Sequence, residues 1–503
     1  MKREAFLGID VGTSSIKCGL VGCQGEDIST SSAEYPLLAP GPGMAEIDGE
    51  AVWTVTARLI RETLGSAHDP VDILGVGVCA MMIMPVLLDA RRQLVRPIIH
   101  WHDERLAAQS GRIKERGKAE SVARYSGSLL TAESTINAVS WVKEHEPDAY
   151  GRIDRFVMIK DFVRLKLCGE LASDFGDASG SLMLDVRGWK WSTELIEELG
   201  FERSFFPELR RPEERAGQIT AEAAAQTGLR EGTPVAVGTG DGICTILGLG
   251  TIEDGDIGFT VGSAGVIGVV SGKLPLDPGH RNYIFCHPLG RRWYSIMATA
   301  SSGDALRWYR NRLLGEPGTP YSELDREAAT VAPGAEGLLF LPYLSGSRNP
   351  HSNPDAVGLF VGIRHKHERR FLTRAVLEGI LYELRDLFEV ESEILARTGT
   401  EMKRIKVSGG IVRSVSWSQM LADILGRDVE LAQTQELGTF GSCLLASVAA
   451  GYHDSLPTAV GRMVKPGRVL PFDGERNRTY SAKYESFRTL YRQMEPVFGL
   501  FTG

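Results

Sequence analysis

A short pattern near the start of the chain recurs about half a chain later, and this repeat limits what the chain can fold into. Residues 9–16 read IDVGTSSI and residues 259–266 read FTVGSAGV, 250 positions further on. Each copy is typical of a strand, a tight turn of glycine and hydroxyl residues, and a second strand. The backbone N–H groups of such a turn can converge on one point, as a phosphate requires. The repeat therefore predicts two similar domains that hold a polyphosphate between them.

Length, charge and cysteine content narrow the class of protein. The chain has 503 residues, which at roughly 150 residues per domain allows two to four domains. The net charge of −8 argues against nucleic acid or an anionic membrane as a partner. The seven cysteines form no C-x-x-C pair, and the N-terminus carries no secretory pattern, so we expect a cytoplasmic protein. The uncharged run at residues 73–88 is shorter than the roughly 18–20 residues of a membrane span.

Helix and strand patterns alternate along most of the chain, which is typical of α/β proteins. The spacing of hydrophobic residues predicts where the strands and helices of both halves lie. Expected strands cover residues 6–11, 16–21, 27–35, 73–79, 234–237, 257–261, 266–270, 282–287 and 293–298, and expected helices cover 51–64, 243–249 and 372–388.

A second repeat relates residues 405–410 to residues 235–240, since both read as a strand that ends in glycines before a helix. The two halves of the chain therefore share a beginning and an end. We place the boundary near residues 250–256, with an N-terminal domain over residues 1–250 and a C-terminal domain over residues 251–503.

The first group of candidate site residues surrounds the repeated turns. Asp10, Gly12, Thr13, Ser14 and Lys17 favour a nucleotide γ-phosphate over the first turn, with Asp10 beside a Mg²⁺ ion through water. The alternative is an ordinary hairpin, but a second copy at Gly262 and Ser263 is hard to explain without a shared ligand.

The second group follows the two glycine-ended strands. Asp241 stands where Ile411 stands in the second copy, and a carboxylate there can accept a proton from a substrate hydroxyl that attacks phosphorus. The alternative is a helix N-cap. Gly409 and Gly410, followed by Ser414, would let a flat ring approach the backbone closely, and the alternative is a plain strand-to-helix turn.

A third group combines Met81 and Met82, after a buried strand, with Trp101 and Asp103. Aromatic and acidic side chains of this kind line sugar pockets, although a helix start with Asp103 as its N-cap explains part of the pattern equally well. The chain contains no G-x-x-x-x-G-K-[ST] sequence, so it is not a P-loop enzyme.

With these motifs the chain resembles the FGGY family of carbohydrate kinases, and within that family the xylulokinases. The resemblance covers residues 5–455 and rests on GIDVGTS at 8–14, GDG at 240–242, GSAG at 262–265 and SGGIVRS at 408–414. Supporting stretches include FLPYLSG at 340–346, RNPH at 348–351 and KDF at 160–162.

The resemblance implies two actin-like (ribonuclease H-like) α/β domains flanking a central cleft, with the sugar on the N-terminal domain and ATP on the C-terminal one. It implies an ATP- and Mg²⁺-dependent kinase whose substrate is a ketopentose such as xylulose. Asp241 would be the catalytic base and, with Asp10, would lie at the metal. The resemblance further assigns Thr13, Ser14, Gly262 and Ser263 to the phosphates, Gly409, Gly410 and Ser414 to adenosine, and Met81, Met82, Trp101 and Asp103 to the sugar.

The chain departs from the xylulokinase pattern beside the expected sugar site. Residues 79–83 read CAMMI where those enzymes carry Gln-Met-His-Gly, and Gly242 replaces an Asn, as in gluconate kinases of the family. Kinases for gluconate, ribulose or a polyol therefore remain alternatives, and an alternative of another class is a non-enzymatic, actin-like ATP-binding scaffold. The sequence does not fix the sugar, the hydroxyl, the regulation or the oligomeric state, of which a homodimer is one that it allows.

Overall fold

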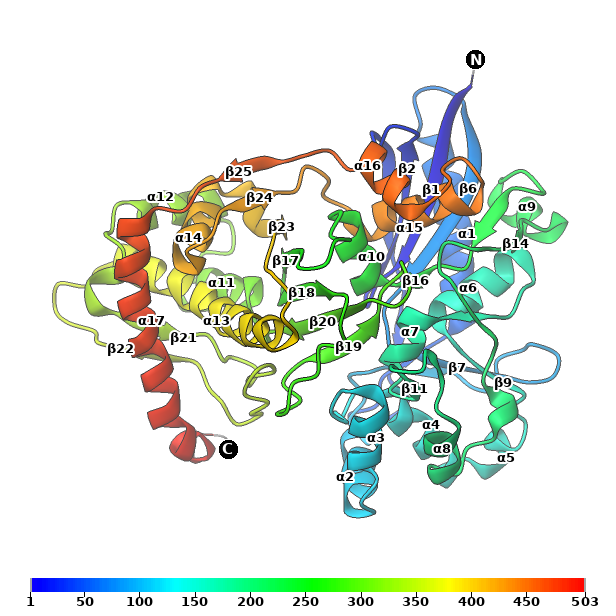
Figure 1. Cartoon of the computed structure of the whole chain (residues 1–503), viewed down its shortest axis with the longest axis horizontal. Coiled ribbons are helices and arrows are strands. Elements are labelled where there is room, and N and C mark those ends of the chain that lie inside the picture. Colours follow the sequence, from blue (N-terminus) through cyan, green and yellow to red (C-terminus); the bar gives the residue numbers. More distant parts are fainter. Residues whose placement is uncertain (1, 502–503) are drawn as a thin grey trace. The chain divides into compact units, whose positions relative to one another are not determined.

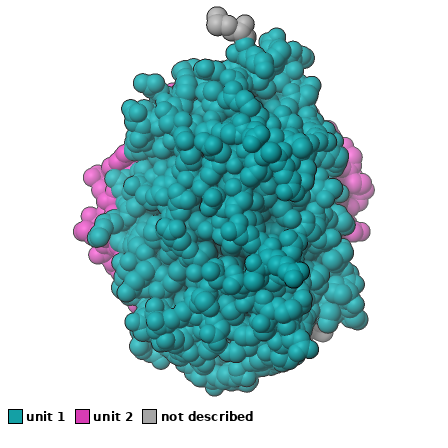
Figure 2. All heavy atoms as spheres, turned by 90° about the vertical axis from the view of Figure 1, so that its right-hand side faces the viewer, with its two compact units in different colours: residues 1–252, 283–294, 436–465 teal, residues 253–282, 295–435, 466–503 magenta. Residues whose placement is uncertain are grey.

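The computed structural model describes residues 2–501 and divides into two compact units. The first unit comprises residues 1–252, 283–294 and 436–465, and the second comprises 253–282, 295–435 and 466–503. Figure 2 colours the first unit teal and the second magenta. The first unit thus includes residues 283–294 and 436–465 from the second half of the chain. The sequence did not predict that these segments belong to it.

The first unit is built on a twisted sheet with the strand order β14-β15-β6-β1-β2-β3, in which β16 also pairs with β6 (Figure 1). The strands are β14 (Arg215–Gln218), β15 (Pro234–Ala236), β6 (Val71–Ala80), β1 (Arg3–Val11), β2 (Ser15–Gly22), β3 (Asp27–Glu34) and β16 (Thr239–Gly240). β1 runs antiparallel to β2 and parallel to β6. The predicted meander and the predicted strand over residues 73–79 are confirmed.

Helices cover the sheet of the first unit. Helices α1 (Gly49–Gly65) and α6 (Ile159–Cys168) contact each other, α1 lying against β2 and β3 and α6 against β6. Helix α15 (Leu437–Ala449) packs on β1, β6 and the helix α10 (Asp241–Gly248). Most of β1 is buried, because neither face of a covered sheet meets water.

Two strand glycines allow α15 to approach the sheet closely. A Cβ atom added at Gly8 would overlap the Thr439 carbonyl oxygen, and one added at Gly77 would overlap the Ser442 carbonyl oxygen. Small residues at these two positions therefore decide how near the helix lies, and the close approach brings the N-terminal end of α15 to the end of β1 that carries Asp10.

A smaller layer of short elements completes the first unit. Its strand pair is β7 (Pro85–Leu88) with β9 (Arg155–Met158), and β10 (Ser173–Asp174) pairs with β13 (Leu209–Arg210). Its helices are α2 (Arg105–Glu115), α3 (Ala119–Ser126), α4 (Thr135–His145), α5 (Pro147–Tyr150), α7 (Phe175–Gly180) and α8 (Thr193–Glu198), and α7 lies against β19 (Tyr283–Cys286). Outside this layer, α9 (Ala221–Thr227) packs on α1, and α16 (Leu456–Met463) packs on α15.

The second unit repeats the central arrangement of the first. Its sheet contains, in order, β20 (Trp293–Ala298), β18 (Gly265–Ser271), β17 (Ile257–Val261), β23 (Ile405–Gly409), β24 (Val429–Leu431) and β25 (Arg468–Leu470). β17 runs antiparallel to β18 and parallel to β23, as β1 does to β2 and β6. The first predicted repeat is confirmed. Both segments of the second repeat are strands that lead towards a helix, as expected. They are not equivalent in their sheets, because β23 occupies the place of β6 beside the hairpin, whereas residues 235–240 form the next strand along.

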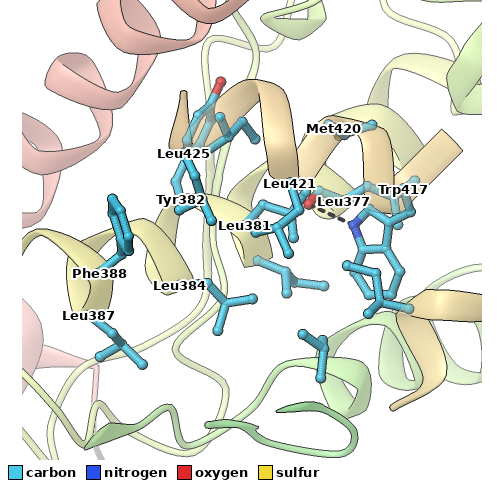
Figure 3. Packing of buried hydrophobic residues seen from close by; sticks show 14 of the residues in the cluster. Leu377, Leu381, Tyr382, Leu384, Leu387, Phe388, Trp417, Met420, Leu421 and Leu425 are labelled. Atoms are coloured by element: carbon cyan, nitrogen blue, oxygen red, sulfur yellow. Dashed lines mark hydrogen bonds between the residues drawn. The ribbon is translucent and has the colours of Figure 1, made fainter. Parts of the chain in front are cut away.

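Long helices make the core of the second unit. They are α13 (Arg369–Thr398), α14 (Val415–Leu425) and α17 (Gly474–Met494), together with the shorter α11 (Gly303–Trp308) and α12 (Tyr321–Ala329); β21 (Leu339–Leu341) pairs with β22 (Leu359–Val361). Figure 3 shows α13 and α14 packed through Leu377, Leu381, Met420, Leu421 and Leu425, with the Trp417 Nε1–H donating to the Leu377 carbonyl oxygen over 3.3 Å. The predicted helix over residues 372–388 is confirmed and is longer than expected.

Candidate active site

The first repeated turn closes the hairpin of β1 and β2. The Gly12 N–H donates to the Ser15 carbonyl oxygen over 2.9 Å, and the Tyr35 hydroxyl donates to the carbonyl oxygens of Gly12 and Thr13 over 2.7 and 2.9 Å. Gly12 and Thr13 are half-buried and Ser14 is exposed. The Tyr35 hydroxyl thus holds the backbone of the turn, while Thr13 and Ser14 stay accessible to a ligand.

Asp10 and Asp241 lie within each other's electrostatic field at the ends of β1 and β16. The pKa of the Asp241 carboxyl is raised to about 7, first by burial and then by the negative charge of Asp10, against the opposing hydrogen bond from the Gly242 N–H. The pKa of Asp10 is raised to about 6, because the effect of burial outweighs the opposing effects of the Cys79 thiol and the charge of Lys17. Two carboxyls with raised pKa values in one place are typical of a catalytic site rather than of a helix cap.

One oxygen of Asp10 has no hydrogen-bond partner in the structure. The Oδ1 atom is inaccessible to solvent and unpaired, while a Cβ atom added at Gly438 in α15 would overlap the Oδ2 atom. A buried carboxylate oxygen without a donor is costly, and a hard cation with oxygen ligands would compensate it. Among residues 2–501 no group of three or more His, Cys, Asp or Glu side chains could hold a metal by itself.

Lys17 lies opposite Asp10 in the β1–β2 register, and its ammonium is already paired. Its Nζ atom lies 2.6 Å from Glu436 Oε2, in the segment that leads into α15. Both side chains remain partly exposed. Glu436 had no motif around it, so the sequence offered no signal that this residue would balance the lysine.

The residues expected at the sugar differ in how much of their surface a substrate could reach. Met82 is half-buried and lies directly over Gly240, next to Asp241. Met81 is only 3% exposed and belongs to the core of the first unit, so it offers a substrate almost no surface. Trp101 is half-buried at the edge of the same core.

Asp103 is buried and fully engaged by protein donors. Its Oδ1 accepts from the Arg105 N–H and guanidinium, and its Oδ2 accepts from the Ala45 N–H over 2.7 Å and from Arg105. Burial raises the pKa of this carboxyl, but the hydrogen bonds from Arg105 and Ala45 outweigh that effect and hold the pKa below its usual value. The structure therefore gives Asp103 a clear supporting role for the loop before α2.

A buried charge cluster supports the strand β16, which leads directly to Asp241. Lys160 is fully buried, with its Nζ atom 2.5 Å from Asp161, 2.9 Å from Asp174 and 3.8 Å from Asp177. Asp174 also accepts a hydrogen bond of 2.6 Å from the hydroxyl of Thr239, two residues before Asp241. The sequence signal for this cluster is the pair Lys160–Asp161, which entered only within the KDF stretch of the family resemblance.

The second unit holds a pocket of about 330 Å³ that unites four of the residues expected at the nucleotide. Gly262, Ser263, Gly410 and Ser414 line it, together with Gly303, Asp304, Arg307, Tyr321, Asp325 and Trp417. The Gly303 N–H donates to the Gly262 carbonyl oxygen over 2.9 Å, which fixes the turn beneath the pocket. Gly409 has a φ of +87°, and a Cβ atom there would lie 2.5 Å from the Val261 carbonyl oxygen, so this position requires glycine. No sequence motif pointed to Tyr321 or Asp325.

Sequence comparison identifies the class of protein to which this pair of sites belongs. Residues 5–248 match the N-terminal domain, and residues 259–450 the C-terminal domain, of the FGGY family of carbohydrate kinases. The chain therefore belongs to the FGGY family of carbohydrate kinases and is a sugar kinase with two actin-like α/β domains, as expected.

Individual relatives cover nearly the whole chain. The xylulose kinase of Escherichia coli (strain K12) is 33% identical over 493 residues, which cover 98% of this chain and 99% of the relative. The gluconokinase of Bacillus subtilis (strain 168) is 29% identical over 506 residues, which cover 98% and 94%. The crystal structure of xylulose kinase from Rhodospirillum rubrum superposes with a TM-score of 0.89 at 29% identity, covering 98% of this chain and 99% of that one.

Proposed function

We propose that this sugar kinase transfers the γ-phosphoryl group of ATP to a hydroxyl of a ketopentose, xylulose being the first candidate. The observation that carries the proposal is the half-buried Asp241, whose pKa is raised to about 7 at the start of α10. A base of that strength can take the proton of the attacking hydroxyl at neutral pH. The xylulose kinases among the relatives support the choice of sugar.

The protein residues act mainly by positioning and by charge. They do so because the transition state of phosphoryl transfer needs little covalent catalysis. The substrate hydroxyl would donate a hydrogen bond to Asp241, which would take the proton as the hydroxyl oxygen attacks phosphorus. Thr13 and Ser14 in the first unit, and Gly262 and Ser263 in the second, would contact the phosphates. Gly409, Gly410 and Ser414 would lie beside adenosine, in and next to the pocket of the second unit.

We propose Mg²⁺ as the metal, held by Asp10 and Asp241. The unpaired, solvent-inaccessible Oδ1 atom of Asp10 supports this assignment. Mg²⁺ commonly takes only one or two protein carboxylates and completes its shell with water and substrate phosphates, so a cluster of three protein ligands is not required. When bound, the ion would neutralise the charge that develops on the phosphates.

The Gly438→Ala variant tests the position of Asp10. The added methyl group would overlap the Asp10 carboxylate, and displacing a reacting group by about 1 Å can cost roughly 10²-fold in rate. We expect kcat to fall at least about tenfold, with the concentration of Mg²⁺ needed for half-maximal rate increased. Gly461→Ala in α16 is the matched control, because its added Cβ has no neighbour within 4 Å. Equal kcat values for the two variants would contradict the assignment.

The pH dependence of the wild-type enzyme tests Asp241 without mutation. Since the free enzyme needs Asp241 unprotonated, kcat/KM should fall as the pH is lowered through about 7. Asp10 and Asp241 interact, so the apparent pKa of this limb belongs to the pair of carboxyls. A kcat/KM that stays constant from about pH 8 down to about pH 5 would remove a base of raised pKa from the mechanism.

Gluconate is the second candidate substrate. The gluconokinase relative and Gly242 after the catalytic base favour it, and the half-buried Met82 and Ile83 leave an apolar edge where xylulokinases carry a histidine. Kinetic selection decides between them: kcat/KM should be measured for D-xylulose, D-ribulose, D-gluconate and erythritol with ATP. If kcat/KM is highest for a ketopentose, the first proposal is supported. If kcat/KM is highest for gluconate, gluconate replaces xylulose as the proposed substrate.

The cysteines bear on the compartment in which the protein works. All seven cysteines are free and buried, which suits a reducing compartment, and we propose the cytoplasm. No helix within residues 2–501 is both long enough and apolar enough to cross a membrane. We propose the sugar and ATP as the partners, with a homodimer as the assembly to be tested by light scattering.

A further inference from the structure

Two pockets of the second unit share a single acidic side chain. The first is the pocket of about 330 Å³ described above, and the second has a volume of about 440 Å³ and lies among the helices α12, α13, α14 and α17. Asp325, in the middle of α12, lines both. A carboxylate at this junction can meet a ligand that occupies either side of it.

The other charged groups of the two pockets already have partners. Arg307 forms an ion pair of 2.8 Å with Asp304. Arg374 donates to Glu378 over 2.5 Å, to the Ala328 carbonyl oxygen and to the Tyr480 hydroxyl. Arg413 donates to Gln435 over 3.1 Å, and Arg476 lies 3.6 Å from Asp423. Each of these cationic side chains therefore has a partner within the protein.

The two aspartates, Asp423 and Asp325, differ in how many protein donors their carboxylates already have. Asp423 accepts from Gln419 and from the Asp473 N–H over 2.9 and 2.8 Å. Asp325 interacts with the Ser414 hydroxyl and, within residues 2–501, has no ion pair. Burial raises the pKa of the Asp325 carboxyl, and the Ser414 hydroxyl opposes that rise. Asp325 thus keeps accepting capacity, since a carboxylate offers about four lone-pair sites.

The position of the phosphates decides which part of a nucleotide reaches Asp325. With the phosphates at Gly262 and Ser263, the lining that remains for the nucleoside includes Tyr321, Asp325, Ser414 and Trp417, together with Gly410 and the cationic Arg307 and Arg413. The exposed Tyr321 offers a flat face to a ring, the buried Trp417 closes the pocket beneath it, and Asp325 supplies an acceptor. The wall is firmly held, because Leu324 is fully buried beside Asp325 and Trp417 is hydrogen-bonded to α13 (Figure 3).

We propose that Asp325 selects the base of the phosphoryl donor by accepting a hydrogen bond from the 6-amino group of adenine. A 6-oxo purine presents an oxygen acceptor at the same place, which the carboxylate repels instead of binding. The selection would be strong because a hydrogen bond to a charged acceptor in a partly desolvated pocket is stronger than one in water. This inference rests on the proposed function, in which the pocket holds ATP.

ATP and ITP form the matched pair of donors, since they differ only at the 6-position and its neighbouring ring nitrogen. For the wild type we expect kcat/KM to favour ATP by about 10- to 100-fold, the range for one hydrogen bond to a charged group. In Asp325→Asn the amide can donate to the 6-oxo group, so the preference should fall to within about threefold. Glu323→Gln, an exposed position on the same helix that lines neither pocket, should keep the wild-type preference.

A wild type without preference, or an unchanged preference in Asp325→Asn, would overturn the inference. Calorimetric binding of ADP and IDP, without any sugar, separates this failure from that of the proposed function. If no sugar is phosphorylated but the ADP preference still depends on Asp325, the proposed reaction fails and the inference stands. Asp325→Ala, which removes the acceptor without adding a donor, should also lose the ADP preference, and its retention of that preference would contradict the inference.

Discussion

Replacing Asp241 by asparagine is expected to lower kcat by about 10²- to 10⁴-fold, the usual effect of losing a general base. Asparagine has the same shape, so the fold and the binding of ATP should persist, but its amide cannot take the proton of the substrate hydroxyl. Steady-state kinetics with the best sugar of the panel measure the change. Asp69→Asn, at an exposed position before β6, is the control.

The stability of the same variant gives a second readout. The pKa of Asp241 is raised in the folded protein, so the ionised carboxylate opposes folding, and stability from this group is lost as the pH rises from about 4 towards 7. A neutral asparagine avoids that cost. Asp241→Asn should therefore be at least as stable as the wild type at pH 8, and near-normal turnover in this stable variant would remove Asp241 from the mechanism.

Replacing Lys160 by methionine is expected to lower the free energy of unfolding of the first unit by about 3–5 kcal/mol, as when one partner of a buried ion pair is removed. The loss would leave Asp161, Asp174 and Asp177 without the ammonium, and both oxygens of Asp177 already lack a hydrogen-bond partner. Arg164, which lies 2.8 Å from Asp161, would compensate only that one carboxylate.

Lys166→Met on the same helix is the matched control, because Lys166 pairs with Glu50 at the surface, where an ion pair contributes about 0–1 kcal/mol. Urea unfolding followed by tryptophan fluorescence reports mainly on the first unit, since all tryptophans except Trp308 and Trp417 lie there. The two units need not unfold together, so their transitions should be fitted separately. A Lys160→Met variant as stable as Lys166→Met would contradict the role of the cluster.

The sequence predicted best what local pattern determines. Alternating apolar residues around Gly12 and Gly262 define both hairpins, because a glycine-hydroxyl turn and two strands need no distant partner to be recognised. The FGGY motifs then identified the fold class and the type of reaction, and the comparisons confirm both.

Local sequence patterns did not predict the contacts between segments that lie far apart in the chain. Residues 436–465 join the first unit because α15 fits over Gly8 and Gly77, a complementarity that no local signal reveals. The strand equivalence of residues 405–410 and 235–240 was wrong for the same reason, since strand order in a sheet depends on distant neighbours. Within the site, the sequence offered Asp103 as a sugar contact or a helix N-cap and did not show that Arg105 and Ala45 hold its carboxylate. Asp325 had no motif.

The central claim is that this chain couples the use of ATP to a sugar hydroxyl. The most direct test measures ADP release by the purified full-length protein with and without D-xylulose, together with the sugar phosphate formed. The account predicts that ADP release depends on a sugar from the panel and equals the sugar phosphate mole for mole. Release of ADP at one rate with every sugar and with none, and no sugar phosphate, would contradict it and favour an actin-like ATP-binding scaffold.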